Sequence, residues 1–487
     1  MKPANDVLPL WAWAEEQAEK RDPAKGNTTQ HATSQTQSWT YGVPSALDRV
    51  RQAAHKDKKT RFTALLHHVT VPRLKAAFEG LERQAAAGVD GMHWREYRQD
   101  LEVRLHELHG RVQRGTYRPR PSRRVYIPKP DGRQRPLGIA ALEDKIVQSA
   151  VVEVLNAIFE EDFLGFSYGF RPGRSPHHAL DALAFALQCR KVNWVLDADI
   201  RGYFDHIQHD WLVKFLQHRI ADGRVVRLIQ KWLKAGVLEQ GEWKATEQGT
   251  PQGATISPLL ANLYLHHVLD LWANHWRKHH AQGEVVLVRY ADDFVMGFEQ
   301  KDDAERFLSE LRERMRKFGL ELHPEKTRLI EFGRFAAIKR AGRGEGKPET
   351  FAFLGFTHYC GRSRQGKFMV LRSTMAKRQH AKLREIHEEL RRRRHQPIPE
   401  QGAWLASVCR GYYAYHAVPG NIRKLGQFRT QVGRRWLASL RRRGQKRRIN
   451  WERMDVLVNR WLPPPRICHP WPWNRFDART RGKSRVR

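Results

Sequence analysis

The chain has 487 residues, with 87 Lys and Arg against 52 Asp and Glu, so its formal net charge at pH 7 is +35. Such an excess excludes the surface of an ordinary metabolic enzyme and favours a polyanionic partner, nucleic acid first and an anionic membrane second. A hydrophobic content of 40% excludes wholesale disorder. The four cysteines form no CxxC pair. The sequence contains no apolar run of about 20 residues, so no membrane span is predicted.

The first part of the chain divides into a polar segment and a helical one. Residues 21–40 are polar and lack periodicity, so residues 1–43 are predicted to be disordered or loosely packed. The N-terminus has no sustained apolar run, and no signal peptide is expected. From about Pro44 to Leu108 the apolar residues recur at helical spacing, which predicts an N-terminal group of helices.

Strands are predicted in the middle of the chain. Residues 118–139 have the pattern of two strands joined at Asp131-Gly132, a dipeptide that favours hairpin turns. A helical segment follows this hairpin. Residues 192–198 form a short apolar run, and residues 285–298 form two apolar arms around Asp292-Asp293. Both patterns are typical of buried strands.

The last quarter of the chain is predicted to be helical and is strongly basic. Residues 361–487 hold 33 Lys and Arg against 7 Asp and Glu, about three quarters of the net charge. The basic runs alternate with aromatic residues, which favours helices that bury their aromatic face and turn cations toward phosphates. For any single run, a solvated face is the alternative. The expected helices span residues 372–396, 401–416, 421–443 and 450–461.

Acidic residues at the ends of apolar runs are the candidates for catalysis. Near the end of one apolar run lie Asp197 and Asp199, and Asp205 follows shortly after it. Between two further apolar runs lie Asp292 and Asp293. Clustered carboxylates repel one another unless cations neutralise them, and ligands made only of oxygen suit Mg²⁺. Two such ions can stabilise the attacking and leaving oxygens of a phosphoryl transfer. A basic protein with this pattern is a candidate nucleic-acid polymerase or nuclease.

Eight sequence blocks resemble those of reverse transcriptases, and specifically those of proteins encoded by bacterial group II introns. They cover roughly residues 85–360, and the segment after Leu371 resembles the thumb or maturase segment, domain X, of the same family. One YADD alone is a weak signal, whereas eight blocks in the order of the family are specific. The blocks are AGVDG (87–91), YRPRPSRRVYIPKPDGRQRPLGI (117–139), FSYGFRPGRSPHHAL (166–180), LDADIRGYFDHI (196–207), GTPQGATISPLLANLYL (249–265), RYADDF (289–294), LELHPEKTRLIEFG (320–333) and FAFLGF (351–356).

The resemblance implies an α+β right-hand polymerase, with fingers, a palm built on an antiparallel sheet, and an all-α thumb or maturase domain. Matched position by position, Asp199, Asp292 and Asp293 would be the catalytic, metal-binding carboxylates. The backbone carbonyl of Ile200 would be a further ligand. The implied cofactor is Mg²⁺, as two ions.

The resemblance also implies a binding site for the incoming dNTP. Lys129 and Arg135 flank the hairpin turn and would close on the triphosphate. Phe204 would stack under the sugar and exclude a ribose 2′-OH, the alternative being a core position. Gln252 would line the pocket of the incoming nucleotide and template, and Ala254 stands where the family usually has a glycine.

Other residues are expected to contact nucleic acid or to have a local role. Lys326 would support the palm or reach the primer–template backbone. Asp197 and Asp205 do not match the catalytic position and are interpreted as polarity at a strand end and in a turn. The remaining expected nucleic-acid contacts are Arg391, Arg392, Arg441, Arg442, Arg443, Lys446, Arg447 and Arg448.

The implied partners are a structured intron RNA, an RNA template with a DNA or RNA primer, target DNA and dNTPs, with no membrane. The oligomeric state stays open, and the expected location is the bacterial cytoplasm, on the nucleoid or on RNA. The expected division of the chain is a polar segment at 1–43, fingers and palm with a helical extension at 44–360, a basic helical thumb or maturase domain at 361–448, and a short nucleic-acid-contacting tail at 449–487.

These observations favour an RNA-directed DNA polymerase that also acts as the maturase of a group II intron, promoting splicing and retrohoming. Because the tail has no paired CxxC motifs, the zinc-supported endonuclease of many relatives is not expected. One alternative is a reverse transcriptase that is independent of any intron and serves the host in DNA repair or defence. Another is an RNA-binding splicing cofactor with a dead polymerase.

Overall fold

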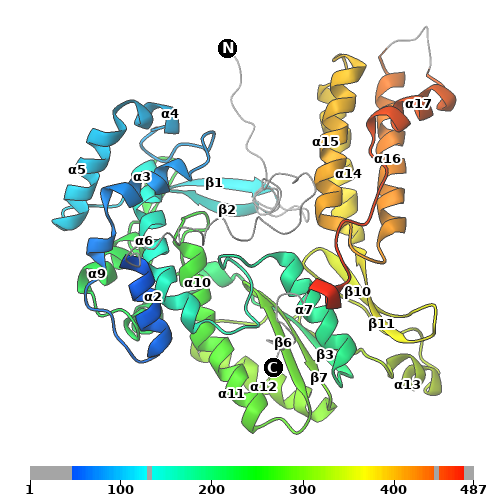
Figure 1. Cartoon of the computed structure of the whole chain (residues 1–487), viewed down its shortest axis with the longest axis horizontal. Helices are drawn as coiled ribbons and strands as arrows, with labels where there is room; N and C mark the ends of the chain where they lie inside the picture. The colour runs from blue at the N-terminus through cyan, green and yellow to red at the C-terminus, as the bar shows by residue number, and fades with distance from the viewer. Residues whose placement is uncertain (1–45, 129–133, 444–448, 476–487) are drawn as a thin grey trace, which may run out of the picture.

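The computed structural model describes residues 46–128, 134–443 and 449–475 (Figure 1). Figure 1 shows N-terminal helices on the left, a central sheet with its helices below, and a column of C-terminal helices at the upper right. A hairpin of β1 (Ser122–Pro128) and β2 (Gln134–Ile139) extends from the first group toward the last. Several expected features lie outside the described residues: the polar segment 1–43, Lys129, the Asp131-Gly132 turn, Lys446, Arg447 and Arg448.

The N-terminal helices pack around α6 (Leu142–Asp162). Glu143 and Asp144 place negative charge in the first turn of α6, which is favourable to the helix dipole. The apolar residues of α6 are buried on several sides, because α2, α3 and helices from the middle of the chain pack against it. The other elements of this group are α2 (Ala46–Lys56), η1 (Leu66–His68), α3 (Val71–Glu79), α4 (Trp94–Tyr97), η2 (Arg98–Asp100), α5 (Leu101–Gln113), α8 (His209–Gln217) and α9 (Gly223–Leu233).

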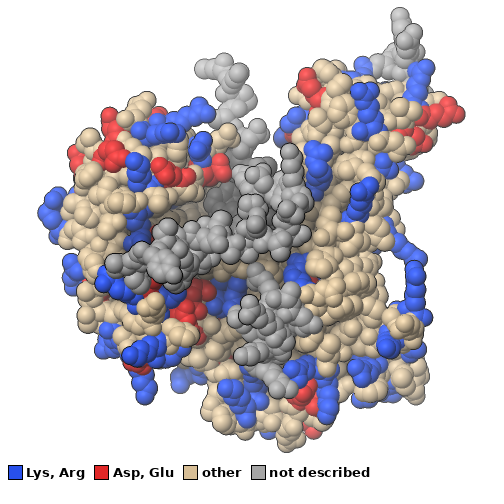
Figure 2. Space-filling model, viewed as in Figure 1, with Lys and Arg blue, Asp and Glu red and all other residues tan. Residues whose placement is uncertain are grey.

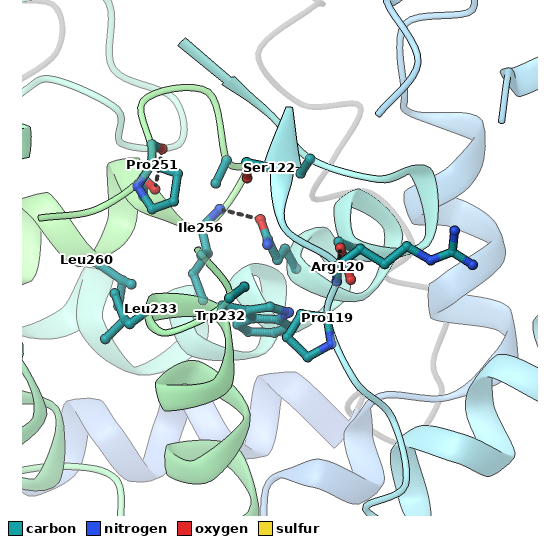
Figure 3. Close-up of a pocket in the computed structure, with 14 residues that line it drawn as sticks. Pro119, Arg120, Ser122, Trp232, Leu233, Pro251, Ile256 and Leu260 are labelled. Carbon is teal, nitrogen blue, oxygen red and sulfur yellow. Dashed lines mark hydrogen bonds between the residues drawn. The ribbon is translucent and has the colours of Figure 1, made fainter. Parts of the chain in front are cut away.

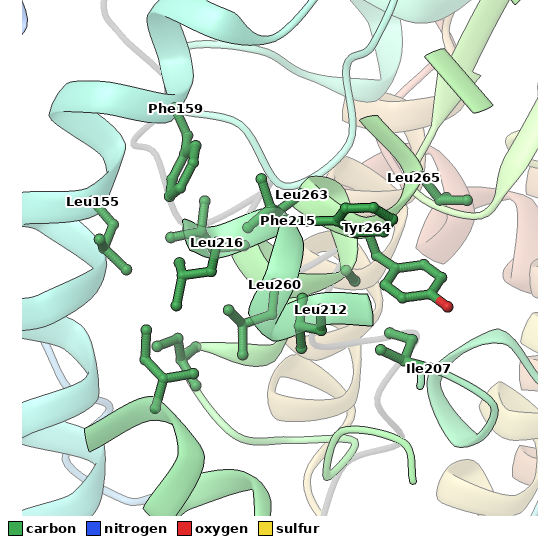
Figure 4. Packing of buried hydrophobic residues seen from close by; sticks show 14 of the residues in the cluster. Leu155, Phe159, Ile207, Leu212, Phe215, Leu216, Leu260, Leu263, Tyr264 and Leu265 are labelled. Atoms are coloured by element: carbon green, nitrogen blue, oxygen red, sulfur yellow. The ribbon is translucent and has the colours of Figure 1, made fainter. Parts of the chain in front are cut away.

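One apolar core joins these helices to the central sheet. Figure 4 shows Leu155 and Phe159 of α6 near Leu216 of α8 and Leu263 of α10 (Ser257–Leu265). Burying one such leucine contributes about 1.5–3 kcal/mol. The same cluster continues to Met296 in the central sheet, so the N-terminal helices and one face of the sheet are stabilised together.

The central sheet has the strand order β6-β7-β3-β8, and all of its pairs are antiparallel. Successive side chains of a strand point to opposite faces. Leu196 and Met296 face the core shared with α12, whereas Val195 and Val295 face the core shared with α7. Because both faces are covered, β6, β7 and β3 are mainly apolar, and the charged residues Asp197 and Arg289 are exceptions that pair with other charges. The elements are α7 (Pro176–Cys189), β3 (Trp194–Asp199), η4 (His266–Asp270), α11 (Leu271–His279), β6 (Val285–Tyr290), β7 (Asp293–Phe298), α12 (Lys301–Lys317), β8 (Arg328–Glu331) and α13 (Ala336–Gly342).

The predicted finger hairpin belongs to a second sheet. β1 pairs antiparallel with β2 and parallel with β4 (Val237–Glu239), which pairs in turn with β5 (Glu242–Lys244). The strand order is β2-β1-β4-β5. The base of the hairpin is therefore fixed by a strand that lies more than a hundred residues later in the chain.

A third sheet corrects the expected boundary at residue 361. β9 (Phe351–Phe353), β10 (Phe356–Arg362) and β11 (Phe368–Thr374) form this sheet, so residue 361 falls inside a strand. The helix expected from residue 372 begins at Ala376 instead. The reason is packing: alternate residues of the hairpin, such as Phe356 and Val370, are buried in the core beside α7.

The C-terminal helices form a separate apolar core that also moves the expected boundary at residue 449. Met454 and Val458 of α17 are buried in the core that α14, α15 and α16 share. Residues 449–462 thus belong to the helical domain and not to the tail. The four helices are α14 (Ala376–Arg392), α15 (Ile398–His416), α16 (Ile422–Arg441) and α17 (Trp451–Trp461).

The chain after α17 returns to the central sheet. Arg475 forms an ion pair with Asp181 of α7, with an Nε–Oδ2 distance of 2.9 Å. The ring of His469 stacks on that of His177, with a centroid separation of 3.8 Å. Residues 463–475, expected to be part of a nucleic-acid-contacting tail, are therefore packed on the protein and tie the C-terminal helices to α7.

The structure confirms the expected α+β class. An antiparallel central sheet is combined with helices on both of its faces, and a helical domain follows it. Among the described helices, none is long and apolar enough to cross a membrane.

Candidate active site

The predicted carboxylates meet at one end of the central sheet. Asp199 is the last residue of β3 and pairs in antiparallel register with Asp293, the first residue of β7. Asp292 precedes Asp293 in the tight turn between β6 and β7. Antiparallel pairing brings the end of one strand beside the start of its neighbour. Acids from two distant sequence blocks thus become neighbours.

Burial raises the pKa of both carboxyls in the turn. For Asp292 burial is the main cause, and the charge of Asp199 raises the pKa further. The pKa of Asp293 lies well above its usual value, first through burial and then through the charge of Asp292. The charges of Arg135 and Lys326 oppose the rise in the pKa of Asp292. Carboxyls held in this way favour a proton or a nearby cation.

Lys326 contacts Asp199 directly. Its Nζ donates to Asp199 Oδ2 at 2.5 Å, and the backbone N–H of His323, in the same turn, donates to the carbonyl of Asp199 at 2.8 Å. Of the two roles expected for Lys326, this contact favours support of the palm over reach toward the primer–template backbone. The position of Lys326 next to a candidate metal ligand is decided by the turn that follows α12.

The donor chemistry of this end of the sheet fits a hard cation such as Mg²⁺. The carboxylates and the predicted further ligand, the carbonyl of Ile200, would offer oxygen donors, and a cation would relieve the mutual repulsion of the acids. Among the described residues, however, no three His, Cys, Asp or Glu side chains are grouped so that they hold a metal ion. In this arrangement Lys326 neutralises Asp199, so a cation at Asp199 has to displace the Lys326 ammonium group.

Two backbone contacts connect the loop before α10 to the finger hairpin and to the turn after β3. The N–H of Thr250 donates to the carbonyl of Phe204 at 2.8 Å, and the N–H of Gly138 on β2 donates to the carbonyl of Gln252 at 2.7 Å. Gly249 has a φ of +83°, and a Cβ there would lie 2.9 Å from the carbonyl oxygen of Phe204. Glycine permits this close approach. These hydrogen bonds thus link the three segments that carry the predicted nucleotide-binding residues Arg135, Phe204 and Gln252.

The side chain of Gln252 is held by an acid that was expected only to make a turn polar. Gln252 Nε2 donates to Asp205 Oδ1 at 3.2 Å, and Asp205 ends the short helix η3 (Tyr203–Asp205). The position of Asp205 in a turn agrees with its expected role. Asp197 lies on β3 and forms an ion pair with Arg328, and burial raises its pKa to about 6.

Phe204 contacts a second aromatic residue that sequence reasoning missed. Its ring meets that of Phe170 edge-on, with a centroid separation of 6.4 Å. Phe170 is 48% exposed and has a φ of +57°, a conformation that bulky residues rarely adopt. Such strain concentrates at functional sites. Nothing local in the FRPG block signals this conformation, because neither composition nor periodicity reports a single dihedral angle.

Arg135 is the described member of the predicted triphosphate-binding pair. It is exposed on β2, opposite Ile127 of β1, and its charge acts on Asp292. The guanidinium is therefore near enough to Asp292 for their charges to interact. Its predicted companion, Lys129, lies outside the described residues.

A small cavity lies behind the loop before α10 (Figure 3). Its volume of about 20 Å³ is enough for one water molecule. Trp232 and Pro251 line it, and Gln148 Oε1 accepts a hydrogen bond from the N–H of Ile256 at 3.3 Å. Ala254 is buried and also lines this cavity. Ala254, which stands where the family usually has a glycine, therefore forms part of the wall of this cavity.

The predicted nucleic-acid-binding arginines divide into two groups. Figure 2 shows Lys and Arg side chains along the C-terminal helices. Arg391 and Arg442 are exposed, and no ion pair of theirs is recorded in the described structure. Arg392 pairs with Glu389 at 3.4 Å. Arg441 donates to the carbonyl of Ile449 at 2.9 Å, and Arg443 donates to two backbone carbonyls between α14 and α15.

A buried arginine behind the acidic turn is the second residue that sequence reasoning missed. Arg289 lies within the RYADDF block and is fully buried, where it forms an ion pair with Asp270. The sequence does contain a signal, because a charged residue inside the apolar run VVLVRY requires a buried partner. The partner itself is not identifiable without the tertiary structure.

Residues 127–358 match the family model described as reverse transcriptase (RNA-dependent DNA polymerase). This range contains the three carboxylates and all the nucleotide-side residues described above. Similar proteins include Protein YkfC of Escherichia coli K12, which is 34% identical over 354 residues. That alignment covers 65% of this chain and 88% of the relative.

Two further relatives are named after introns. The group II intron-encoded protein LtrA of Lactococcus lactis subsp. cremoris is 36% identical over 222 residues, which is 45% of this chain and 37% of LtrA. Nuclear intron maturase 1, mitochondrial, of Arabidopsis thaliana is 32% identical over 92 residues, which is 19% of this chain and 13% of the relative.

Proposed function

Because this chain belongs to the reverse transcriptase (RNA-dependent DNA polymerase) family, we propose that it copies a group II intron RNA into DNA and serves as the maturase of that intron. The polymerase activity follows from the family. The association with an intron is supported by relatives that are named as group II intron-encoded proteins and intron maturases. Because the chain spans 37% of LtrA, the maturase activity and retrohoming are part of this proposal.

One observation carries the catalytic assignment: the meeting of Asp199, Asp292 and Asp293 at the end of the central sheet, within reach of the charge of Arg135. A structural role has little use for acids that raise one another's pKa. A site that binds cations together with a triphosphate does use them, because each positive charge relieves the repulsion.

The proposed reaction is nucleotidyl transfer. The primer 3′-oxygen forms a bond to the α-phosphorus of a dNTP, the bond from that phosphorus to the bridging oxygen breaks, and pyrophosphate leaves. When bound, two Mg²⁺ ions would lower the pKa of the 3′-hydroxyl and neutralise the triphosphate. Asp199, Asp292, Asp293 and the carbonyl of Ile200 would hold them.

The other side chains bind and orient the substrates. Arg135 and Lys129 would bind the triphosphate, the first as a planar fork and the second as a point charge. Phe204 would pack under the sugar, and Gln252, held by Asp205, would line the nucleotide pocket. Lys326 orients Asp199 through their ion pair. Positioning of this kind, together with neutralisation of charge, accelerates a phosphoryl transfer.

Nucleic acid is held by the basic part of the chain. Structured intron RNA, the RNA template with its DNA or RNA primer, and target DNA would be contacted mainly through their phosphates, since the last quarter of the chain carries most of the excess charge. The exposed Arg391 and Arg442 are the strongest candidates among the described arginines. The proposed location is the bacterial cytoplasm, on RNA or the nucleoid.

The test of the polymerase site is Asp292→Asn, assayed by extension of a DNA primer on an RNA template with Mg²⁺. We expect DNA synthesis to fall at least about a hundredfold, because a charged ligand is lost while no phosphate contact is removed. RNA affinity, measured by filter binding, stays at the wild-type value. Asp302→Asn is the matched control, because Asp302 is the exposed member of an acidic pair in the first turn of α12.

Two results would contradict the assignment. If Asp292→Asn lost RNA binding as strongly as synthesis, the acid would be structural. If the wild-type protein extended no primed RNA, a splicing cofactor without polymerase activity would replace the proposal. RNA that copurifies with the protein tests the intron: a single structured RNA encoded around the gene supports the maturase, and a diverse pool supports an intron-independent host polymerase.

A further inference from the structure

Arg289 is a fully buried arginine directly before the acidic turn. Its Nε donates to Asp270 Oδ1 at 2.7 Å and its Nη2 to Asp270 Oδ2 at 2.5 Å, a bidentate ion pair of two residues that are both fully buried. Removing two charges from water is costly, and a buried pair is weak evidence for added stability. Such a pair is better explained by what it holds in place.

The rest of the guanidinium connects three segments around the acidic turn. Nη1 donates to the carbonyl of Ala291 at 2.9 Å and to Asn262 Oδ1 at 3.1 Å, and Nη2 donates to Ser167 Oγ at 2.8 Å. The backbone of Arg289 also pairs with the segment before Phe170, through the N–H of Tyr168. The only described contact of this side chain with the turn itself is the one to the carbonyl of Ala291.

Ala291 is held in a conformation that alanine does not prefer. Its φ is +56°, in the left-handed region, and it lies between Tyr290 and Asp292 in the turn. Left-handed geometry is unfavourable for a residue with a side chain, so surrounding contacts must maintain it. The neighbouring Gly169 is packed so closely that a Cβ there would lie 2.2 Å from the backbone nitrogen of Ala291. The turn is thus confined on one side and hydrogen-bonded on the other.

The position of Asp270 is set by the shape of the helix that carries it. Asp270 ends a π-helical turn, His266–Asp270, between α10 and α11. In an unbroken α-helix Asn262 and Asp270 would lie roughly a quarter of a turn apart, and the extra residue of a π-turn removes most of this offset. Both side chains therefore reach the same guanidinium. Single π-turns of this kind are frequent at functional sites.

We propose that Arg289 is a positioning residue, which holds the Ala291 turn in its left-handed conformation and thereby sets the places of Asp292 and Asp293. Asp270, Asn262 and Ser167 fix the guanidinium so that one hydrogen bond to the Ala291 carbonyl controls the turn. This inference rests on the proposed role of the two aspartates. It adds a residue that contacts neither substrate nor metal.

The test combines Arg289→Lys with Ala291→Gly. Lysine keeps the charge opposite Asp270 but lacks the fork that reaches the Ala291 carbonyl. We expect kcat for primer extension to fall roughly tenfold to a hundredfold, with the KM for dNTP changed less than about twofold. Glycine adopts a φ of +56° without strain. In the double variant kcat therefore recovers most of the loss, while the Tm stays as low as in Arg289→Lys.

Arg372→Lys is the matched control. Arg372 and Asp181 form a second buried ion pair, with a distance of 3.1 Å and both side chains 2% exposed, on β11 and α7. We expect this variant to lower the Tm in the same way, to leave kcat within about twofold, and to show no response to Ala291→Gly. The inference would be overturned if Arg289→Lys had the same kcat as the wild-type protein, or if Ala291→Gly did not reverse its loss of kcat.

If Arg289→Lys does not fold, Ser167→Ala replaces it in the test. This change removes one hydrogen bond from the guanidinium and leaves its ion pair intact. The expected result is a fall in kcat of about threefold that Ala291→Gly reverses, and an unchanged kcat counts against the inference. Failure of the proposed function is distinguishable, because it would abolish extension by the wild-type protein as well.

Discussion

At the scale of single residues, the nucleotide side of the site is held by backbone contacts. The carbonyl of Phe204 accepts a hydrogen bond from Thr250, and its ring meets the exposed ring of Phe170. Phe170 is itself fixed in a left-handed conformation. One contact thus restrains the backbone of Phe204 and another its ring, as the proposed exclusion of a 2′-hydroxyl requires.

Phe204→Ala should allow ribonucleotides to be incorporated. Without the ring, the pocket no longer excludes a 2′-hydroxyl, and we expect the ratio of kcat/KM for dNTP to that for rNTP to fall about tenfold or more. Single-nucleotide extension with matched dNTP and rNTP measures this ratio. Phe335→Ala, at an exposed position beside α13, should leave it unchanged. An unaltered ratio in Phe204→Ala would make the ring a packing residue.

At the scale of elements, the C-terminal helices use their arginines for two purposes. Arg443 donates to carbonyls between α14 and α15, and Arg441 to a carbonyl before α17, so both satisfy backbone groups near helix ends. Arg391 and Arg442 stay exposed. A basic run in the sequence therefore contains exposed arginines that are available for the proposed binding, together with arginines that join helices.

The two purposes predict different effects of charge removal. Arg391→Gln combined with Arg442→Gln should reduce the slope of log K against log salt for RNA or DNA binding by about 1.4–1.8, because two phosphate contacts are lost. Arg443→Gln should lower the Tm and leave this slope unchanged. Binding isotherms at several salt concentrations, with thermal melts, measure both quantities. Equal slopes in all variants would mean that the two exposed arginines face solvent.

At the scale of the whole molecule, the fold of this strongly basic chain buries several histidines in their neutral form. Burial lowers the pKa of His266, His358 and His416 to about 3 in each case. In the unfolded chain these groups bind protons near pH 6.5, so below that pH the unfolded state gains protons first and stability falls. Asp144 acts oppositely, because burial raises its pKa to about 6 and the folded state then binds the proton first.

Among the described residues, burial lowers the pKa of seven histidines and raises the pKa of six aspartates, Asp144 included, so acid should on balance destabilise the fold. Each titrating histidine costs about 1.4 kcal/mol per pH unit below 6.5, and added positive charge increases the repulsion within a chain of net charge +35. The urea concentration at the midpoint of unfolding, measured at pH 7.5, 6.5 and 5.5, should be lower at pH 5.5 than at pH 6.5. His358→Phe, which keeps the stacking on Phe351, should reduce this fall. A midpoint that rises toward pH 5.5 would show that the acids dominate.

Much of the fold and the site is contained in local sequence patterns. Apolar runs with acids at their ends predicted β3 and the β6–β7 hairpin, and the order of the blocks predicted the family. These features are readable because strand alternation, helical periodicity and motif spacing are local properties of a chain. The identity of Asp199, Asp292 and Asp293 as candidates came from the sequence for the same reason.

The tertiary structure alone decided which charges meet. The pairing of Lys326 with Asp199, of Arg475 with Asp181 and of Arg289 with Asp270 joins residues from different elements, and no local pattern specifies such partners. The hairpin at residue 361 and the return of the tail to α7 also depend on which apolar faces remain to be covered. The sequence by itself therefore determined which side chains are candidates for catalysis. The packing of the elements determined which residues surround these side chains and pair with them, because burial and ion pairing depend on positions in space.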